Sequence, residues 1–268
     1  RMSASPPATD VRRDEREWQN ETGWTYQERA HARAGTRFVL ERQFGRIAHA
    51  LGAEPAHAAL DLGCGTGFLV DWLARNAPAR WCGADLSLSA MRKAHERNPA
   101  LGLSTGDAER LPYRHGAFDR IVCNGSAHHF LDLDKAMREV FRILAPGGRL
   151  VLYEPVATPL GEAVRQGLFK DSKYESPVDL AHKHEFTRRS VEESLARCGF
   201  TGVRAEFRDF LAYPLTGMYL ALPWSEWRGL FRVLWGIEAG LARIAPLKPL
   251  LDLVSWRLLV VAEKPPRA

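Results

Sequence analysis

Two adjacent histidines, His128 and His129, stand in the stretch NGSAHHFLDL, between a Gly-Ser pair and an acidic run that predicts the start of a helix. A neutral imidazole can take a proton from a hydroxyl, an ammonium or an acidic carbon, so either histidine is a candidate catalytic base. The pair has no third metal ligand at a useful spacing, because the one other cluster is His-x-His-Glu at 182–185. We therefore predict no metal site.

Glu154 is the third residue that could take part in chemistry. It ends the segment RLVLYEP, which predicts a strand, and it should face the same edge of the protein as the histidines. The alternative is that its carboxylate caps a neighbouring backbone amide and has no chemical role.

A glycine-rich loop, DLGCGTG at Asp61–Gly67, follows the first predicted strand. Phe68 stands where a dinucleotide fingerprint G-x-G-x-x-G needs glycine, and the Gly-Lys-Ser/Thr of a phosphate-binding P-loop is absent. A tight turn that needs glycine for backbone geometry alone is the simpler interpretation. The functional interpretation is a loop whose backbone closely approaches a ligand.

Acidic residues follow the next two predicted strands. Asp85 lies 24 residues after Asp61, where a carboxylate can accept both hydroxyl groups of a ribose. Asp107, in GDAERLP, could accept a hydrogen bond from an exocyclic adenine amine. Each aspartate alone could sit in a surface turn, but an acid after each of three successive strands, together with the glycine loop, favours a nucleoside-binding site.

Short apolar segments alternate with amphipathic helical segments along the chain. This pattern predicts βαβ units and a parallel sheet, and therefore an α/β fold. Because crossovers are right-handed, the loops that follow the strands should meet at one edge of the sheet, where ligands bind. The expected strands are 58–62, 79–85, 101–107, 118–124, 149–155, 202–210 and 256–264.

The order of DLGCGTG, AD-L-S, GDAERLP, FDRIVCN and LAPGGRL resembles the class I S-adenosylmethionine-dependent methyltransferases. Among them it is most similar to the small-molecule group that includes ubiquinone/menaquinone-biosynthesis C-methyltransferases. The resemblance is strong over about residues 55–155 and loose over 185–208. It implies a Rossmann-like, seven-stranded, mostly parallel sheet with an N-terminal helical lid and a helical insertion before the last strand.

The resemblance also implies S-adenosyl-L-methionine as cofactor and assigns residues to it. Asp61 and the loop glycines would surround the methionine part, Asp85 the ribose, and Asp107 the adenine edge. A histidine at this position in such enzymes also commonly shapes only the cofactor pocket. The expected cofactor-binding residues are Tyr26, Asp61, Gly63, Cys64, Gly65, Gly67, Asp85, Leu86, Met91, Asp107, Ala108, Asn124, Gly125 and His129.

The expected domain organisation follows from composition and resemblance. Residues 1–16, rich in Pro, Ser and charge, predict a disordered tail. Residues 17–54, which carry Trp18, Trp24 and Tyr26 near their start, predict a helical lid over the cofactor. The methyltransferase core is expected at 55–209 and 256–265, with a lid segment at 156–186 and a helical cap insertion at 210–255.

Several functional classes are disfavoured by the sequence. The stretch NGSA replaces the Asp/Asn-Pro-Pro-Tyr/Phe of nucleic-acid amino-methyltransferases, and no basic-aromatic appendage is present, so no nucleic-acid partner is expected. The net charge of +5 is a weak signal. The four cysteines form no C-x-x-C pair, which predicts reduced thiols and a cytoplasmic protein. No apolar run reaches the roughly 20 residues that span a bilayer.

These observations predict metal-independent methyl transfer to a small, apolar or aromatic acceptor of natural-product or lipid type, at O, N or C. The alternatives are a methyltransferase fold that uses the bound cofactor for other chemistry, and a non-catalytic partner subunit. Four of eight tryptophans lie in or just beyond 210–255. That insertion is expected to be a pocket cap or homodimer interface, or alternatively a peripheral membrane contact or tunnel for a lipid-like substrate.

Overall fold

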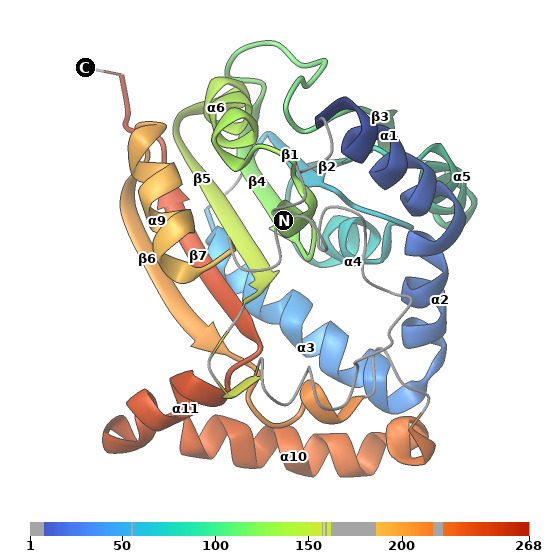
Figure 1. The fold of residues 1–268 in the computed structure, drawn as a ribbon, viewed down its shortest axis with the longest axis vertical. Helices are drawn as coiled ribbons and strands as arrows, with labels where there is room; N and C mark the ends of the chain where they lie inside the picture. The colour runs from blue at the N-terminus through green and yellow to red at the C-terminus, as the bar shows by residue number, and fades with distance from the viewer. Residues whose placement is uncertain are drawn as a thin grey trace, which may run out of the picture.

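The structure, a computed structural model, describes residues 8–54, 56–156, 158, 160–161, 186–216 and 222–267. At its centre is a seven-stranded sheet of order β3-β2-β1-β4-β5-β7-β6 (Figure 1). The first five strands along the chain run parallel, and β7 runs antiparallel to both β5 and β6. The predicted mostly parallel α/β sheet is therefore confirmed. The strands are β1 (Ala58–Leu62), β2 (Arg80–Asp85), β3 (Gly102–Thr105), β4 (Phe118–Asn124), β5 (Leu144–Pro155), β6 (Thr201–Arg208) and β7 (Arg257–Glu263).

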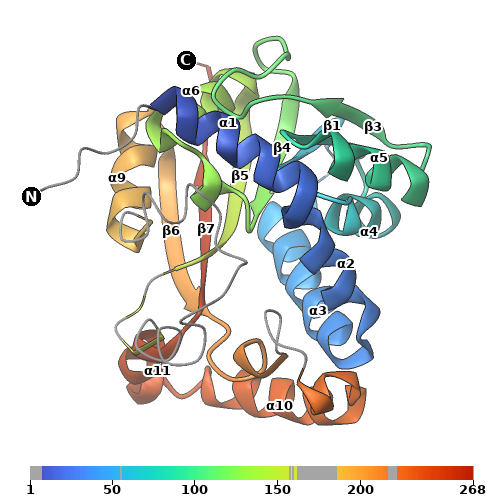
Figure 2. The same ribbon diagram turned by 45° about the vertical axis from the view of Figure 1, so that its right-hand side comes forward.

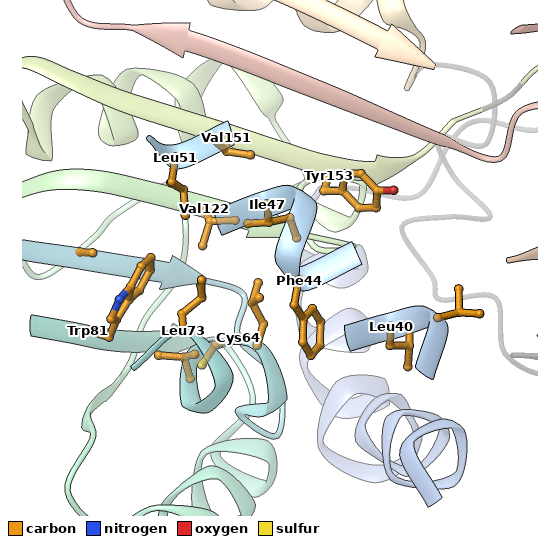
Figure 3. Packing of buried hydrophobic residues seen from close by; sticks show 14 of the residues in the cluster. Leu40, Phe44, Ile47, Leu51, Cys64, Leu73, Trp81, Val122, Val151 and Tyr153 are labelled. Atoms are coloured by element: carbon orange, nitrogen blue, oxygen red, sulfur yellow. The ribbon is translucent and has the colours of Figure 1, made fainter. Parts of the chain in front are cut away.

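Helices cover both faces of the sheet. One face packs against α3 (Ala34–Leu51), α4 (Phe68–Asn76) and α5 (Leu88–Arg97). The other face packs against α6 (Leu133–Ile143) and α9 (Arg188–Arg197). Figure 3 shows the first of these cores, in which Phe44 and Ile47 of α3 lie close to Val122 and Val151 of the sheet. The three layers bury apolar side chains on both sides of the central strands, as a parallel sheet requires.

Alternation along the strands decides which side chains share a face. In β4, Ile121 and Cys123 lie in the core under α6, whereas Val122 lies in the core under α3. Because successive side chains point to opposite faces, the polar residues at the strand ends are sorted in the same way. Four of them fall on the α3 face: Asp61, Asn124, Tyr153 and Arg257. Glu154 falls on the opposite face.

The N-terminal residues form a helical arm. It consists of α1 (Ala8–Trp18), a π-helical turn at Gln19–Gly23 and α2 (Trp24–Ala32), which packs on α3. Residues 8–16, which the sequence places in a disordered tail, belong to α1 in the structure. Val11 and Glu15, four residues apart on one face of α1, are buried, so this charged segment has a packed side. Figure 2 shows the arm passing in front of the sheet, while residues 1–7 lie outside the described part of the chain.

The insertion between β6 and β7 is helical in its described residues. It contains a short turn at Pro223–Glu226, α10 (Arg228–Leu241), another turn at Ala245–Leu247 and α11 (Lys248–Val254). Phe231 of α10 is fully buried against α3, at a point where a Cβ on Gly35 would collide with its ring. The expected lid segment at 156–186 lies mostly outside the described residues, as do the histidines at 182 and 184.

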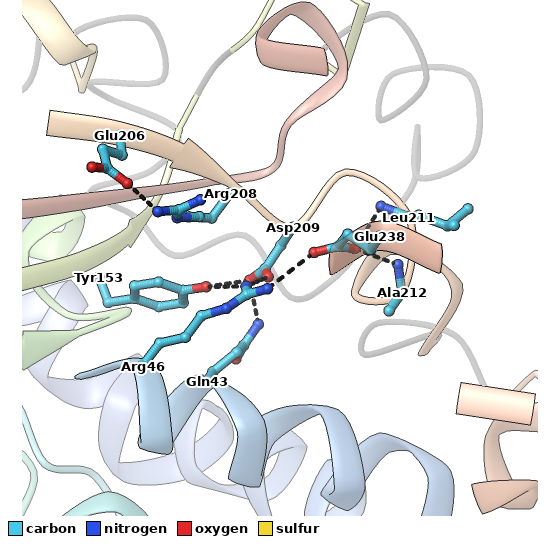
Figure 4. Close-up of polar contacts among 9 residues, drawn as sticks. All are labelled: Gln43, Arg46, Tyr153, Glu206, Arg208, Asp209, Leu211, Ala212 and Glu238. Atoms are coloured by element: carbon cyan, nitrogen blue, oxygen red, sulfur yellow. Dashed lines mark hydrogen bonds and ion pairs between the residues drawn. The ribbon is translucent and has the colours of Figure 1, made fainter. Parts of the chain in front are cut away.

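A buried polar network joins this insertion to the sheet and to α3 (Figure 4). The Asp209 carboxylate accepts hydrogen bonds from Gln43 Nε2 at 2.5 Å, Arg46 Nη1 at 2.5 Å and the Tyr153 hydroxyl at 2.6 Å. Glu238 of α10 accepts from the backbone amides of Leu211 and Ala212 at 3.0 and 2.9 Å. Arg46 also lies 3.4 Å from Glu238, so one guanidinium contacts two buried carboxylates.

Candidate active site

Two adjoining cavities lie at the carboxyl edge of the parallel strands. The first, with about 870 Å³ of space that extends into open solvent, is bordered by the loops after β1 to β4 and by the N-terminal arm. The second, of about 570 Å³, lies on the α3 side of the sheet. Both cavities are lined by Tyr26, Gln27, Gly63 and Gly125. The convergence of loops that the topology predicts is therefore present, and a ligand at Gly63 would contact both spaces.

The glycine loop packs closely against two other segments. Gly63 has a φ of 74°, and a Cβ there would collide with the side chain of Ser126 in the loop after β4. Gly65 has a φ of 54°, and a Cβ there would collide with the Gln27 side chain of the arm. Only glycine meets both demands, positive φ and close approach. The loop thus leaves backbone groups at the cavity wall.

Asp85 holds the glycine loop from the end of β2. Its carboxylate accepts hydrogen bonds from the backbone amides of Gly65 and Ser87, both at 2.8 Å. Burial raises the pKa of Asp85, and these amide hydrogen bonds oppose that rise. An ionised carboxylate has about four acceptor sites, so two remain for the hydroxyls of a ribose. Leu86, next along the chain, lines the first cavity with Ala108.

Asp61 is buried on the α3 face and lines the second cavity. Its Oδ2 atom has no hydrogen-bond partner among the described residues. Burial, followed by the negative charge of Asp85, raises the pKa of Asp61 to about 8. A buried carboxylate oxygen needs a donor, so this position suits a cationic ligand group such as an ammonium.

Asp107 lines the first cavity, but its carboxylate is already engaged. It forms an ion pair with Arg12 of α1 and accepts a hydrogen bond from the backbone amide of Glu109 at 2.9 Å. Arg12 also pairs with Glu109. The arm therefore borders the first cavity, and its Arg12 forms an ion pair with Asp107, the residue expected to accept a hydrogen bond from the adenine amine. Sequence reasoning missed Arg12 because its charged segment was interpreted as a tail.

The two histidines each face a buried carboxylate. His128 Nδ1 lies 2.8 Å from Glu154 Oε2, and His129 Nδ1 lies 3.5 Å from Glu15 Oε1. Glu154 also accepts a hydrogen bond from the backbone amide of Ser126 at 3.1 Å. Glu154 therefore caps an amide, as the alternative interpretation expects, and its carboxylate also contacts His128, while its part in chemistry stays a prediction.

The charge state of Glu154 depends on its partners. Burial alone would raise its pKa, but the hydrogen bond and charge of His128, with the charge of Arg257, lower it below the ordinary value. Glu154 is therefore an anion that fixes the imidazole of His128. His129 lines the first cavity directly, while His128 stands beside it, with the two ring centroids 4.0 Å apart.

The remaining expected cofactor residues divide into three groups. Cys64 and Asn124 line the second cavity, and Gly125 lines both. Gly67 begins α4 and lies against Ala94, where a Cβ would be too close. Met91 is buried in the core under α3, and the neighbouring Ala90 lines the first cavity instead. Among the described residues, no group of three or more His, Cys, Asp or Glu is arranged to hold a metal ion.

Comparison with known proteins finds several relatives that are named methyltransferases. A family model described as "Methyltransferase domain" matches residues 60–152. Methyltransferase GfsG of Streptomyces halstedii is 38% identical over 122 residues, which are 43% of this chain and 44% of that protein. Malonyl-[acyl-carrier protein] O-methyltransferase of Methylococcus capsulatus is 35% identical over 180 residues, 63% of this chain and 62% of that protein.

A demethylmenaquinone methyltransferase of Thermus thermophilus is 41% identical over 107 residues, 38% of this chain and 49% of that protein. The chain thus matches between 44% and 62% of the length of these three curated relatives. Two solved structures share the fold at low identity. Phosphoethanolamine N-methyltransferase 2 of Haemonchus contortus, solved with S-adenosyl-L-methionine, has a TM-score of 0.64 at 18% identity, covering 94% of this chain and 60% of that one. The [4+2]-cyclase SpnF has a TM-score of 0.53 at 20% identity, covering 84% and 81%.

The raised pKa of Asp61 predicts how stability changes with pH. Between its unfolded value of 3.8 and its folded value of about 8, the folded protein holds a proton that the unfolded chain has released. The free energy of unfolding should therefore fall as the pH rises through this range. Urea denaturation of the ligand-free protein should show this decline, and Asp61→Asn should reduce it. A smaller decline should remain, because the pKa of Asp85 is also raised. Equal pH slopes for Asp61→Asn and the parent protein would contradict this assignment, with Asp252→Asn, in α11, as the control.

Proposed function

We infer that this chain, whose residues 60–152 match the methyltransferase domain family, is an S-adenosylmethionine-dependent methyltransferase that acts on a small acceptor. One observation carries this inference. The glycine loop, Asp61, Asp85 and Asp107 stand at the ends of successive strands and line two cavities that adjoin at Gly63. The match of the family model to the same segment of chain supports it independently.

The residues present fit the cofactor. Asp85 has acceptor capacity for the ribose, and Leu86 and Ala108 offer apolar walls to the adenine ring. The unpartnered Oδ2 of Asp61 suits the ammonium of the amino-acid end, beside Asn124 and Gly125. S-adenosylmethionine supplies a methyl group already activated on a sulfonium. The task of the protein is then to position the acceptor and exclude water, which contributes up to about 7–11 kcal/mol in the best-oriented cases.

His128 and Glu154 are the residues we assign to proton removal from the acceptor. With Nδ1–H directed at Glu154, the imidazole presents Nε2 as its basic nitrogen, and the carboxylate stabilises the imidazolium that forms. His129, beside Glu15 and Trp18, shapes the wall of the first cavity. The base matters only for an acceptor that carries a proton to be lost, such as a hydroxyl or an acidic carbon.

The acceptor we propose is small and apolar or aromatic. Trp24, Phe130 and Leu131 supply apolar wall to the first cavity. Relatives are named for demethylmenaquinone and for malonyl-[acyl-carrier protein]. Methylation at O, N or C is consistent with these surroundings. The proposal is tested by incubating the protein with S-adenosylmethionine and a panel of such acceptors and measuring S-adenosylhomocysteine. If no acceptor leads to S-adenosylhomocysteine formation, the result counts against the proposal.

Different chemistry on the same fold is the second candidate, because the [4+2]-cyclase SpnF has a similar structure. Cofactor binding without S-adenosylhomocysteine formation, but with conversion of an acceptor, would favour it. Cofactor binding with no conversion would favour a non-catalytic partner subunit. The acidic residues of the cofactor cavity argue against that last alternative.

We propose that the exposed side of α10 makes a peripheral contact with an anionic membrane surface. Trp227, Val233 and Ile237 are 64%, 59% and 48% exposed. Exposed arginines at 228 and 232 flank them, the acidic Glu238 is buried, and one acidic residue beside Trp227, Glu226, is exposed. Apolar side chains among cations match a negatively charged lipid surface. In the described ranges no helix is both long and apolar enough to cross a bilayer.

Asp85→Ala should weaken S-adenosylmethionine binding by roughly 10- to 100-fold, the expected loss of hydrogen bonds to a charged group. Isothermal titration calorimetry measures the affinity, and circular dichroism checks the fold, because Asp85 also holds the glycine loop. Asp252→Ala, in α11 and outside both cavities, is the matched control. An unchanged affinity would refute the ribose role.

His128→Gln should reduce turnover of a proton-bearing acceptor by roughly 10²- to 10⁴-fold, the usual contribution of a general base. Glu154→Gln should also reduce turnover, because an amide no longer stabilises the imidazolium. Neither variant should change the affinity for S-adenosylhomocysteine. The pH–rate profile is the measurement, with His95→Gln on α5 as control, and a full-rate His128→Gln enzyme would remove the base from the mechanism.

Val233→Asp combined with Ile237→Asp should abolish co-sedimentation with liposomes of anionic lipid, because two charges replace exposed apolar contacts. Neutral liposomes should bind the parent protein more weakly. Leu88→Asp, which changes a 51% exposed leucine on α5, serves as the control. Equal partitioning of all variants would contradict the contact, and a concentration-dependent change of mass in light scattering would instead identify a homodimer.

A further inference from the structure

A buried arginine stands at the inner wall of the second cavity. Arg257 opens β7, pairs in register with Pro155 and points to the α3 face. It is 5% exposed. Its Nη2 donates a hydrogen bond to Asn124 Oδ1 at 2.7 Å, and its guanidinium carbon lies 5.0 and 5.3 Å from the ring centroids of Tyr153 and Tyr213. The side chain is therefore fixed in place.

The charge of Arg257 has no counter-ion at contact distance among the described residues. Its Nε is buried and donates no hydrogen bond there, and no carboxylate lies within 4.0 Å of its nitrogens. The nearest acidic groups have other partners, since Glu154 holds His128 and Asp209 holds Arg46. A buried cation without a counter-ion is costly, and an anionic ligand at contact distance would offset that cost.

The cavity gives this cation access to a ligand. Arg257 lines the second cavity together with Asn124, Gly125 and Asp61. A Cβ on Gly125 would come to 3.5 Å from Nη1, so glycine leaves the approach to the guanidinium open. Among the described residues, the same cavity thus holds one carboxylate oxygen without a hydrogen-bond partner, on Asp61, and one guanidinium without a counter-ion at contact distance.

We propose that Arg257 is the cation of a buried carboxylate-binding site. A guanidinium held between hydrogen-bonding and aromatic neighbours offers its remaining N–H groups in a planar fork, which matches a planar carboxylate. A phosphate dianion fits less well, because it would bring two negative charges to one cation beside Asp61. The carboxylate comes from the amino-acid end of the cofactor or from the acceptor, so the proposal rests on the proposed function.

The first arm of the test asks whether the cofactor supplies the carboxylate. S-adenosylhomocysteine and 5′-methylthioadenosine, which lacks the amino-acid part, are titrated into the parent protein and Arg257→Met by calorimetry. If the cofactor fills the site, the variant should bind S-adenosylhomocysteine roughly 10- to 100-fold more weakly, the cost of a lost charged hydrogen bond, and 5′-methylthioadenosine equally well.

The second arm asks whether the acceptor supplies it. Benzoate is added to protein saturated with S-adenosylhomocysteine, with chloride as the salt control, and the Tm is recorded. If the site is open beside the cofactor, benzoate should raise the Tm of the parent protein and leave that of Arg257→Met unchanged, as binding to the folded state requires. A positive result in either arm supports the proposal.

The proposal is overturned if Arg257→Met leaves both the S-adenosylhomocysteine affinity and the benzoate response unchanged. Arg257→Lys keeps the charge without the fork and should give an intermediate effect, which covers the case in which Arg257→Met does not fold. Arg232→Met, an exposed arginine on α10, is the control. If the parent protein binds no S-adenosylhomocysteine, the proposed function fails, while benzoate added to the ligand-free protein still tests the anion site.

Discussion

The buried carboxylate of Asp209 forms the interactions on which the packing of α3, β5 and α10 depends. It accepts hydrogen bonds from α3 and from β5, and it shares Arg46 with Glu238 of α10. A buried carboxylate is stable only when paired in this way, so the segments that supply its partners must pack together. Asp209 has a φ of 60°, which aspartate tolerates better than most residues. Both the backbone conformation of Asp209 and its buried charge therefore favour the packing of α3, β5 and α10 around it.

The network also positions the wall of the second cavity. The Tyr153 hydroxyl donates to Asp209, which fixes the phenol ring, and the guanidinium of Arg257 lies over that ring. Arg46 is thus paired with two carboxylates, whereas Arg257, on the other side of the Tyr153 ring, has none at contact distance among the described residues. The fold supplies counter-ions to Arg46 and leaves Arg257 for a ligand, which is why the two arginines have different roles.

Much of the architecture follows from local sequence. Short apolar strands, each followed by a loop of small or acidic residues, predict a parallel sheet and a shared edge, and the structure has both. The places of Asp85 and the glycine loop at the wall of the first cavity were predictable, because both stand at the ends of parallel strands. Met91 was assigned to the cofactor by resemblance alone, and it packs in the core, because its position on α5 faces the sheet.

Residues whose roles depend on distant partners could not be predicted. Arg12 pairs with Asp107 across 95 residues, and Arg257 contacts Asn124 across 133. No spacing in the chain signals such contacts, because they exist only once the sheet brings the segments together. The two-residue alternation within a strand, applied to β7, would have placed Arg257 on the face of Asp61 and Asn124. It would not have shown that the cation lacks a partner.

The charged residues change from mostly acidic in the first cavity to one acid and one arginine in the second, and a single ligand can match both. Glu15, Asp85, Asp107 and Glu109 line the first cavity, with Arg12 as the cation that bridges two of them. The second cavity holds Asp61 and then Arg257. A ligand that carries hydroxyl groups and a positive centre at one end, and an ammonium and a carboxylate at the other, would satisfy these groups in that order. The unpaired atoms of Asp61 and Arg257 are the features that distinguish such a ligand from a neutral nucleoside, because only a charged tail meets both.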